Sequence, residues 1–441
     1  MAWGSSSFRS CTALWEKVEQ NDPSLIDLYI LPTKDVTKAD WERCIQALQR
    51  HGRERNLSSI HASGHAIDVE SLRQLSRALY ETSQQVGWTE IAIGDSNLGD
   101  DGLIALVDSF AKDFQLASLD MSYKSISTKG LRSVLEWSKS SDFLKKLDLS
   151  RNMDLVKGLS TNDFPVREGS NSFPALEEVN LSDCNLQGES GMLLVAFLAS
   201  APSLQLLRLS QNPLGSLIVD SLNKVSSSLV EISLSQCGLM DEHFEKLVPS
   251  LSKLEYLHTL DMSQNNLTEY GVVTLAKGMV DGFSVLKSIH LAGNPLQGNG
   301  VISFFEHLGQ QRKTKLHYLD LSSTQCSAEA ARLAIISSDA QQLRLFDNAL
   351  GSEGFRLLSD SLRGGHPTIQ SLDLAGNVAN EEAVVELLQG LLITETGFNS
   401  ALETLVVGGN QGGQSLERLL QQIKEIRPGL DIARDRIRKA S

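Results

Sequence analysis

A short leucine pattern recurs along nearly the whole chain and leaves few folds open to it. The pattern is L-x-x-L-x-L-x-x-N/C-x-L, with clear copies in LKKLDLSRN from Leu144, LHTLDMSQNNL from Leu257 and LKSIHLAGNPL from Leu286. Fourteen copies can be aligned, at intervals of 24 to 33 residues. Self-similarity at such a period is typical of a repeat array, in which each unit completes its core only by stacking on its neighbours. The copies begin at Leu25, Leu57, Trp88, Leu116, Leu144, Leu176, Leu204, Leu229, Leu257, Leu286, Leu316, Ala340, Ile369 and Leu402.

Most copies are followed by a segment with the spacing of an amphipathic helix. Apolar residues recur every three or four positions in 189–201, 269–280 and 352–365. The usual interval of 28 or 29 residues has room for a strand, a turn, a helix and a return loop. Strands lie ~4.8 Å apart whereas helices pack ~8–10 Å apart, so such a stack must curve. We therefore expect an α/β horseshoe with a parallel sheet on its concave face and helices on its convex face.

Two further residue types recur at fixed places in the units. Glycines near the start of the helical segments are expected to let each helix pack closely on the preceding turn; they are Gly102, Gly130, Gly191, Gly271 and Gly354. The ninth position of the pattern is usually polar, and we expect its side chain to turn inward and satisfy backbone groups of the adjacent turn. The residues there are Asn152, Cys184, Asn212, Cys237, Asn265, Asn294, Thr324, Asn348, Asn377 and Asn410.

This combination of strand and helix resembles the ribonuclease-inhibitor type of leucine-rich repeat, over roughly residues 20–430. The resemblance implies a right-handed leucine-rich-repeat solenoid. The stretches LKSIHLAGNPLQGNGV from Leu286 and LHYLDLSSTQCS from Leu316 are also locally similar to CARMIL-type regulators of actin-capping protein. Tropomodulins carry a shorter array of similar repeats. The repeat is specific for fold and nearly silent on function.

The two ends of the sequence depart from the repeat, as the terminal units of a solenoid must. Residues 1–24 are predicted to form a capping helix, with Leu14, Trp15 and Val18 facing inward. Residues 25–429 form the array of about fourteen repeats, interrupted by an irregular Gly-, Ser- and Pro-rich loop at 153–173. Residues 430–441 are predicted to supply a last edge strand, as the C-terminal cap, and a basic tail.

Charge and cysteine usage narrow the class of protein. Lys and Arg number 40 against 54 Asp and Glu, giving a net charge of −14, which argues against broad binding to a phosphate backbone. The five cysteines are far apart and contain no C-x-x-C pair, as expected for free thiols in a reducing compartment. We expect an intracellular, cytoplasmic protein, with the nucleus left open, that binds no nucleic acid and does not insert into a membrane.

Alternate strand positions should face the concave wall. The residue between the second and third anchors of each unit gives a row that contains five Asp and two Arg. Any single Asp is better explained as a common, solvated form of the repeat, whereas the whole stripe suggests a groove for a basic or mixed-charge protein partner. The row is Tyr29, His61, Ala92, Asp120, Asp148, Asn180, Arg208, Ser233, Asp261, His290, Asp320, Arg344, Asp373 and Val406.

Tyr318, Arg344 and Phe346 add the residue types favoured at interface hot spots. The candidate partner-binding residues on the concave wall are therefore Arg208, Asp261, Tyr318, Asp320, Arg344, Phe346 and Asp373. The loop at 153–173 is the competing recognition element, because long loops in a compact array are often functional.

The sequence contains no nucleotide-binding, nucleophile-elbow or zinc-protease motif. We expect no catalytic residues, no cofactor and no metal. The first interpretation is a non-enzymatic protein-protein interaction scaffold or adaptor that uses the concave face. The alternatives are a GTPase-activating protein of the Ran type, which shares this repeat class, and an actin-cytoskeleton regulator of the CARMIL or tropomodulin type.

Overall fold

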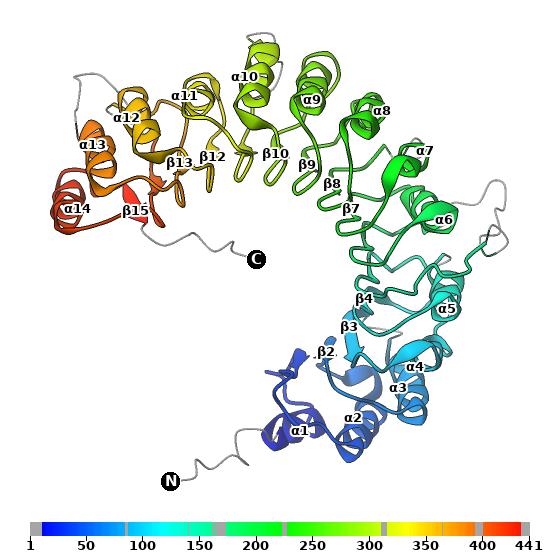
Figure 1. Cartoon of the computed structure of the whole chain (residues 1–441). Coiled ribbons are helices and arrows are strands. Elements are labelled where there is room, and N and C mark those ends of the chain that lie inside the picture. Colours follow the sequence, from blue (N-terminus) through cyan, green and yellow to red (C-terminus); the bar gives the residue numbers. More distant parts are fainter. Residues whose placement is uncertain are drawn as a thin grey trace. The chain divides into compact units, whose positions relative to one another are not determined.

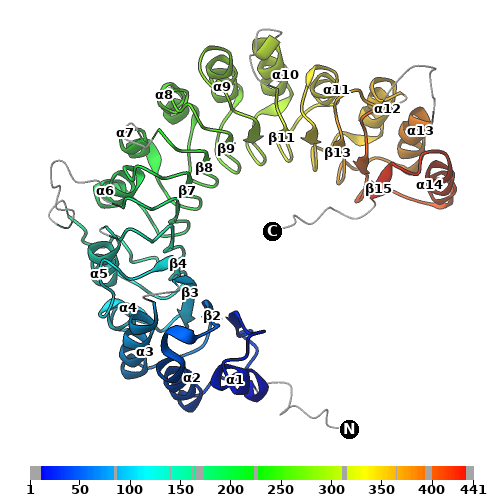
Figure 2. The same cartoon turned by 180° about the vertical axis from the view of Figure 1, so that it is seen from behind.

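The computed structural model describes residues 11–83, 87–139, 141–160, 163, 173–222, 227–309, 315–363, 365–392 and 400–433. The chain divides into two compact units, unit 1 (residues 1–229) and unit 2 (residues 230–441). Within each unit the strands lie side by side on the inner face and the helices cover the outer face (Figures 1 and 2).

Unit 1 contains a parallel sheet whose strands follow one another in chain order. Its strands are β1 (Asp27–Tyr29), β2 (Ser59–Ser63), β3 (Trp88–Gly94), β4 (Leu116–Asp120), β5 (Lys146–Asp148), β6 (Glu178–Asn180) and β7 (Leu206–Arg208). Its helices are α1 (Thr12–Glu19), α2 (Lys38–His51), α3 (Val69–Thr82), α4 (Gly99–Val107), α5 (Thr128–Ser138), α6 (Gly188–Ala199) and α7 (Ile218–Leu222), with short 3₁₀ turns at Gly52–Glu54 and Gly215–Leu217.

Unit 2 repeats the same arrangement with a second run of parallel strands in chain order. Its strands are β8 (Glu231–Ser233), β9 (Thr259–Asp261), β10 (Ser288–His290), β11 (Tyr318–Asp320), β12 (Gln342–Arg344), β13 (Ser371–Asp373), β14 (Thr404–Val406) and β15 (Asp431–Ala433). Its helices are α8 (Asp241–Leu251), α9 (Glu269–Asp281), α10 (Gln297–Leu308), α11 (Ala328–Ser337), α12 (Gly351–Ser361), α13 (Glu381–Leu391) and α14 (Gln414–Ile426).

The anchors of the pattern form the core between sheet and helices. Leu286, Ile289 and Leu291 of one copy are at most 1% exposed, and the corresponding residues of the other copies are also buried, except Leu25 at the start of the first copy, which is partly exposed. Each strand is only three to seven residues long, so its stability comes from stacking on its neighbours. The predicted α/β leucine-rich-repeat architecture is confirmed.

The asparagines at the ninth position of the pattern form hydrogen bonds with backbone groups of adjacent turns, as the sequence predicts. Asn152 accepts hydrogen bonds at Oδ1 from the backbone N–H groups of Lys124 and Ile126, both at 3.0 Å. Its Nδ2 donates to the carbonyls of Met121 at 2.9 Å and Leu149 at 2.8 Å. One side chain therefore ties two consecutive turns together, and Asn212 and Asn265 repeat the same four bonds.

The helix-start glycines serve two purposes. At Gly102 and Gly354 an added Cβ would lie 2.8 Å from Leu98 Cδ1 and from Leu350 Cβ respectively, so these helices do pack on the preceding turn. At Gly271 the space is taken instead by the carboxylate of Asp241, from the previous repeat. That carboxylate accepts the N–H groups of Thr268 (2.8 Å) and Gly271 (3.1 Å) and so caps the next helix.

The first part of the irregular 153–173 segment packs against the array. In the described residues 153–160 it is a series of turns with no helix, as the sequence indicates. Leu155, Val156 and Leu159 are at most 6% exposed, and Thr128 donates its hydroxyl to the carbonyl of Leu155. Most of the remaining loop (161–162 and 164–172) lies outside the described residues.

Across the described ranges, no helix combines the length and the apolar content needed to span a membrane.

Candidate functional site

The predicted row of side chains is present, in one register within each unit. In unit 2 the paired residues run Ser233, Asp261, His290, Asp320, Arg344, Asp373, Val406 and Ala433, from β8 to β15; we call these residues the unit 2 ladder. In unit 1 they run Tyr29, His61, Ala92, Asp120, Asp148, Asn180 and Arg208. Arg208 therefore belongs to unit 1, and the six other predicted contact residues belong to unit 2.

Each Asp of the unit 2 ladder supports the end of its own strand. One oxygen of Asp261, Asp320 and Asp373 accepts the backbone N–H two residues further on, at 3.0, 2.9 and 3.0 Å. Asp120 and Asp148 make the same bond in unit 1 at 2.8 Å. The recurrent L-D-L-S sequence thus has a local structural reason, because the carboxylate satisfies an amide where the strand ends.

The second carboxylate oxygens lie among side-chain donors. Asp261 Oδ2 accepts the hydroxyl of Ser233 at 3.0 Å, and Asp320 Oδ2 accepts the phenol of Tyr318 at 3.0 Å. Asp320 and Asp373 are only 8% and 7% exposed. These carboxylates are consequently held in fixed orientations rather than freely solvated.

Tyr318 connects neighbouring members of the ladder. Its ring lies 4.5 Å from the ring of His290, measured between centroids, and the Arg344 guanidinium carbon lies 5.5 Å from its centroid. Burial, and then the neighbouring Asp320 carboxylate, raise the pKa of the Tyr318 phenol. The phenol stays protonated at neutral pH, and Tyr318, His290 and Arg344 form one aromatic and cationic cluster.

Arg344 lies between Asp320 and Asp373 in the strand register but forms no ion pair with either carboxylate. Its backbone pairs with Asp320 on one side and Asp373 on the other. In the described part of the chain, no carboxylate oxygen comes within 4.0 Å of its guanidinium nitrogens. Its fork of N–H donors is therefore available to an acceptor on a partner.

Phe346 packs against the turn after β13. A Cβ on Gly376 would sit 2.9 Å from Phe346 Cε2, and Gly376 has a φ of +68°, so only glycine suits this place. The aromatic ring thereby forms an apolar border beside Arg344.

One hollow on the strand face brings these groups together. Asp261, His290, Asp320, Arg344, Phe346 and Asp373 line it, with serine hydroxyls such as those of Ser322 and Ser323 between them. Tyr318 borders it through its contacts with Asp320 and Arg344. His290 stands in the predicted row but was not among the predicted contact residues; its position between two Asp residues was the available signal.

The comparisons agree with this repeat architecture. A family model described as Leucine Rich repeat matches residues 174–195. The ribonuclease inhibitor of Sus scrofa is 25% identical over 224 residues, which cover 49% of this chain and 49% of that protein. This chain is a leucine-rich-repeat protein of the ribonuclease-inhibitor-like type.

Other relatives share the repeats within longer proteins. The Tonsoku-like protein of Danio rerio is 29% identical over 311 residues, 66% of this chain and 21% of that protein. A mouse protein named NACHT, LRR and PYD domains-containing protein 5 is 30% identical over 129 residues, 28% of this chain and 11% of that protein. This leucine-rich-repeat chain spans about half, or less, of the length of these relatives.

Unit 1 of this leucine-rich-repeat protein holds a buried lysine that was not predicted from the sequence. Lys124 is 3% exposed, and its Nζ donates to the Ser63 hydroxyl at 3.3 Å. Burial lowers the pKa of Lys124, while Asp120, Asp95 and Asp148 oppose that change. The bond ties the end of β2 to the turn after β4 and leaves little of the ammonium accessible.

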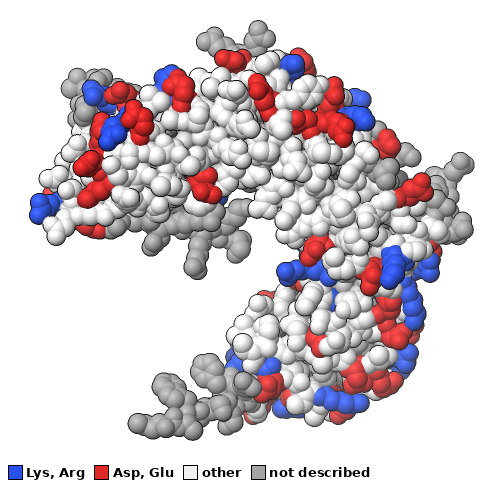
Figure 3. Space-filling view, in the orientation of Figure 1, with Lys and Arg blue, Asp and Glu red and all other residues white. Residues whose placement is uncertain are grey.

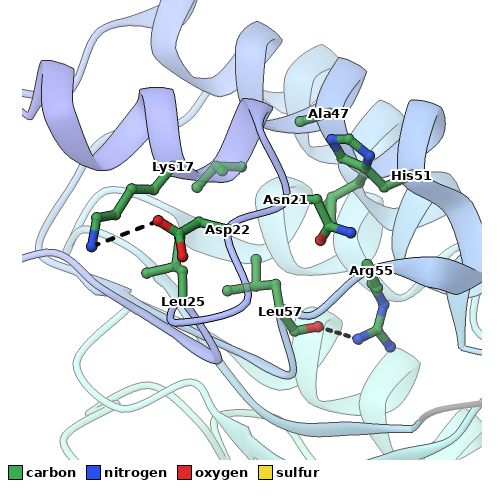
Figure 4. A pocket seen from close by; sticks show the side chains of 10 residues that line it. Lys17, Asn21, Asp22, Leu25, Ala47, His51, Arg55 and Leu57 are labelled. Atoms are coloured by element: carbon green, nitrogen blue, oxygen red, sulfur yellow. Dashed lines mark hydrogen bonds and ion pairs between the residues drawn. The ribbon is translucent and has the colours of Figure 1, made fainter.

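Another hollow, this one in unit 1, lies beneath the capping helix α1 (Figure 4). Lys17 and Asp22 form an ion pair there at 3.9 Å, and Arg55 donates to the carbonyl of Leu57. The Arg55 guanidinium carbon lies 3.8 Å from the ring centroid of Trp88, and burial lowers the pKa of Arg55 to about 10. These contacts complete the packing of the N-terminal cap. We therefore explain the hollow as a feature of that packing rather than as a binding site.

Charge is distributed unevenly over this leucine-rich-repeat protein. On the face shown in Figure 3, Lys, Arg, Asp and Glu side chains gather mainly over the helices. Among the described residues, no three His, Cys, Asp or Glu side chains are grouped so that they could hold a metal ion.

Proposed function

We propose that this protein is a non-enzymatic interaction scaffold that holds a protein partner on the strand face of unit 2. The observation that carries the proposal is the cluster of Tyr318, His290 and Arg344 beside the hollow. Tyrosine and arginine dominate interface hot spots, and Arg344 presents donors that no described carboxylate occupies.

Rigidity supports this surface as a docking site. The side chains stand on hydrogen-bonded strands and are oriented by one another, so little conformational entropy is lost on binding. Three Asp and one Arg in the ladder favour a basic or mixed-charge partner and disfavour a nucleic acid backbone. Among the relatives, the ribonuclease inhibitor bears a name that describes action on another protein.

The proposal also covers the contact residue Arg208 and the cellular compartment, both of which come from the sequence interpretation. Arg208, on β7 of unit 1, is a separate contact and is tested by its own alanine variant. The cytoplasm is the proposed compartment, because all five cysteines are buried and free.

Replacing Tyr318, Arg344 and Phe346 together by alanine is expected to weaken partner binding by at least ~2 kcal/mol, about thirtyfold in Kd. The partner is first identified by affinity purification and mass spectrometry, then titrated as purified protein by calorimetry. Arg344→Ala alone serves as a second variant, since Arg344 is only half-buried and is not one of the core anchors.

The matched control is Tyr256→Ala/Tyr270→Ala/Arg356→Ala, which removes similar side chains that lie outside the ladder. Unchanged affinity in the ladder variants would contradict the proposal. Loss of binding only when residues 164–172 are replaced by a Gly/Ser linker would assign recognition to the loop. That replacement spares the buried Leu155, Val156 and Leu159.

The absence of catalysis is part of the proposal and is tested directly. The purified chain, mixed with a panel of small GTPases loaded with GTP, is expected to leave phosphate release at the intrinsic rate of each GTPase. An acceleration that disappears with one Arg substitution would establish the GTPase-activator alternative instead.

A further inference from the structure

Two carboxylates of the unit 2 ladder lie in the hollow without a counter-ion from the described chain. Asp261 and Asp320 both line the hollow. Among the described residues, no nitrogen of Lys, Arg or His comes within 4.0 Å of either carboxylate. Asp320 is only 8% exposed, and aspartates are rarely buried to this extent unless they are paired. This part of the strand face therefore carries a negative charge that its own side chains do not balance.

The hydrogen bonds of these two carboxylates fix their orientation but do not cancel their charge. Each uses one oxygen to accept a backbone N–H, at 3.0 Å for Asp261 and 2.9 Å for Asp320. The other oxygen accepts a neutral hydroxyl at 3.0 Å, from Ser233 in one case and from Tyr318 in the other. A carboxylate has about four lone-pair sites, so each keeps acceptor capacity for a further donor.

An imidazole lies between the two carboxylates in the strand register. Pairing places His290 of β10 between Asp261 of β9 and Asp320 of β11. With strands ~4.8 Å apart, the two aspartates stand ~10 Å from one another along the ladder. The ring of His290 packs on the ring of Tyr318, with 4.5 Å between the centroids. We call Asp261, His290 and Asp320 the β9–β11 slot.

The neighbouring strands offer an internal comparison. Arg344 of β12 stands between Asp320 and Asp373, as His290 stands between Asp261 and Asp320. The chain thus places its own guanidinium between one pair of aspartates and an imidazole between the other. The β9–β11 slot is the place on this wall that is suited to a cation from outside the chain.

We propose that the β9–β11 slot is the anchor site for an arginine side chain of the protein partner. The inference rests on the proposed function and deepens it, because it names the chemistry of one central contact. A guanidinium has five N–H donors around a flat group, so it can donate to Asp261 on one edge and to Asp320 on another. Its face can stack on the imidazole of His290.

The same chemistry makes arginine a better ligand than lysine. An ammonium is a compact, strongly hydrated charge that can approach a carboxylate but has no flat face to stack on a ring. A guanidinium is more weakly hydrated and loses less on entering a site where Asp320 is nearly buried. The slot is therefore expected to distinguish the two cationic side chains as well as to require a positive charge.

The first test uses the full chain and three small probes, the N-acetyl-N′-methylamides of arginine, lysine and citrulline. Citrulline has nearly the shape of arginine but carries no charge. Saturation-transfer NMR of the probe measures its affinity. The arginine probe is expected to bind at least threefold more tightly than the lysine probe and at least tenfold more tightly than the citrulline probe. Equal affinity of the arginine and citrulline probes would overturn the proposal.

A variant of the two carboxylates locates the bound probe. Asp261→Asn/Asp320→Asn is expected to weaken binding of the arginine probe at least tenfold while keeping the strand ends intact, because Asn180 makes the same backbone bond at 3.1 Å. The matched control Asp281→Asn/Asp360→Asn makes the same change in net charge at two exposed places of unit 2 outside the ladder. It should bind the arginine probe as the unaltered chain does. Equal affinity in the two double variants would contradict the slot.

His290→Ala separates stacking from charge. It is expected to weaken binding of the arginine probe at least threefold and to leave the affinity for the lysine probe within a factor of two, since only the guanidinium stacks on the ring. An equal loss for both probes would show that the slot does not select arginine. None of these measurements needs the partner, so a negative result contradicts the slot alone. Failure to capture any protein partner would instead contradict the proposed function.

Discussion

Leu291→Ala is expected to lower the free energy of unfolding by about 2–5 kcal/mol. Leu291 follows β10 directly and is 0% exposed, and its N–H donates to the carbonyl of Asp320 on the next strand, at 2.9 Å. Alanine leaves a cavity where two repeats meet, so the loss combines transfer free energy with lost packing. Urea denaturation measures the change, and hydrogen exchange should show faster opening in the adjacent repeats.

Leu291→Met is the control for the cavity, because it roughly conserves volume and should cost less than ~1.5 kcal/mol. A loss below ~0.5 kcal/mol for the alanine variant would mean that Leu291 is not part of the core.

Asn152→Ala is expected to cost at least ~3 kcal/mol, although it removes only a small polar group. Its amide makes the four backbone hydrogen bonds described above and is 0% exposed. Alanine leaves two N–H groups and two carbonyls buried without that partner, and each such group costs ~1–3 kcal/mol. Thermal and urea unfolding of unit 1 should both report the loss.

The next repeat provides the matched control. Cys184 occupies the same place there, and its thiol is directed to the carbonyl of Leu149, at 3.1 Å. Asn152→Cys should therefore be less harmful than Asn152→Ala. Equal losses in the two variants would show that packing, rather than hydrogen bonding, sets the importance of this position.

The register of the strand face could be predicted from the sequence because the repeat fixes it. Once the anchors point inward, alternation along each strand places Asp320, Arg344 and Asp373 in one row, and pairing confirms that row. The absence of a helix in the described residues 153–160 could equally be predicted, because the Gly, Ser and Pro content of the segment after Asn152 opposes helix formation.

Contacts between side chains of different repeats could not be predicted in the same way. The periodicity explains why Gly271 is small but not that Asp241 fills the space, because the pattern contains no signal for a carboxylate that caps the next helix. Likewise, Lys124 and Ser63 are 61 positions apart. Lys124 stands at the ninth position of the copy that begins at Leu116, where the pattern usually has Asn or Cys, but the pattern does not indicate Ser63 as its partner. The functional use of Tyr318, Arg344 and Phe346 remains a prediction, since residue type and position do not identify a partner.

The burial of the cysteines has a practical consequence for labelling. Burial raises the pKa of Cys44, Cys184 and Cys326 to about 12, and Cys11 and Cys237 are buried as well. Since the thiolate is the reactive form, maleimides and iodoacetamides should find almost no native target at neutral pH. A single cysteine introduced on an exposed helix could then carry a dye or spin label without removal of the five native thiols.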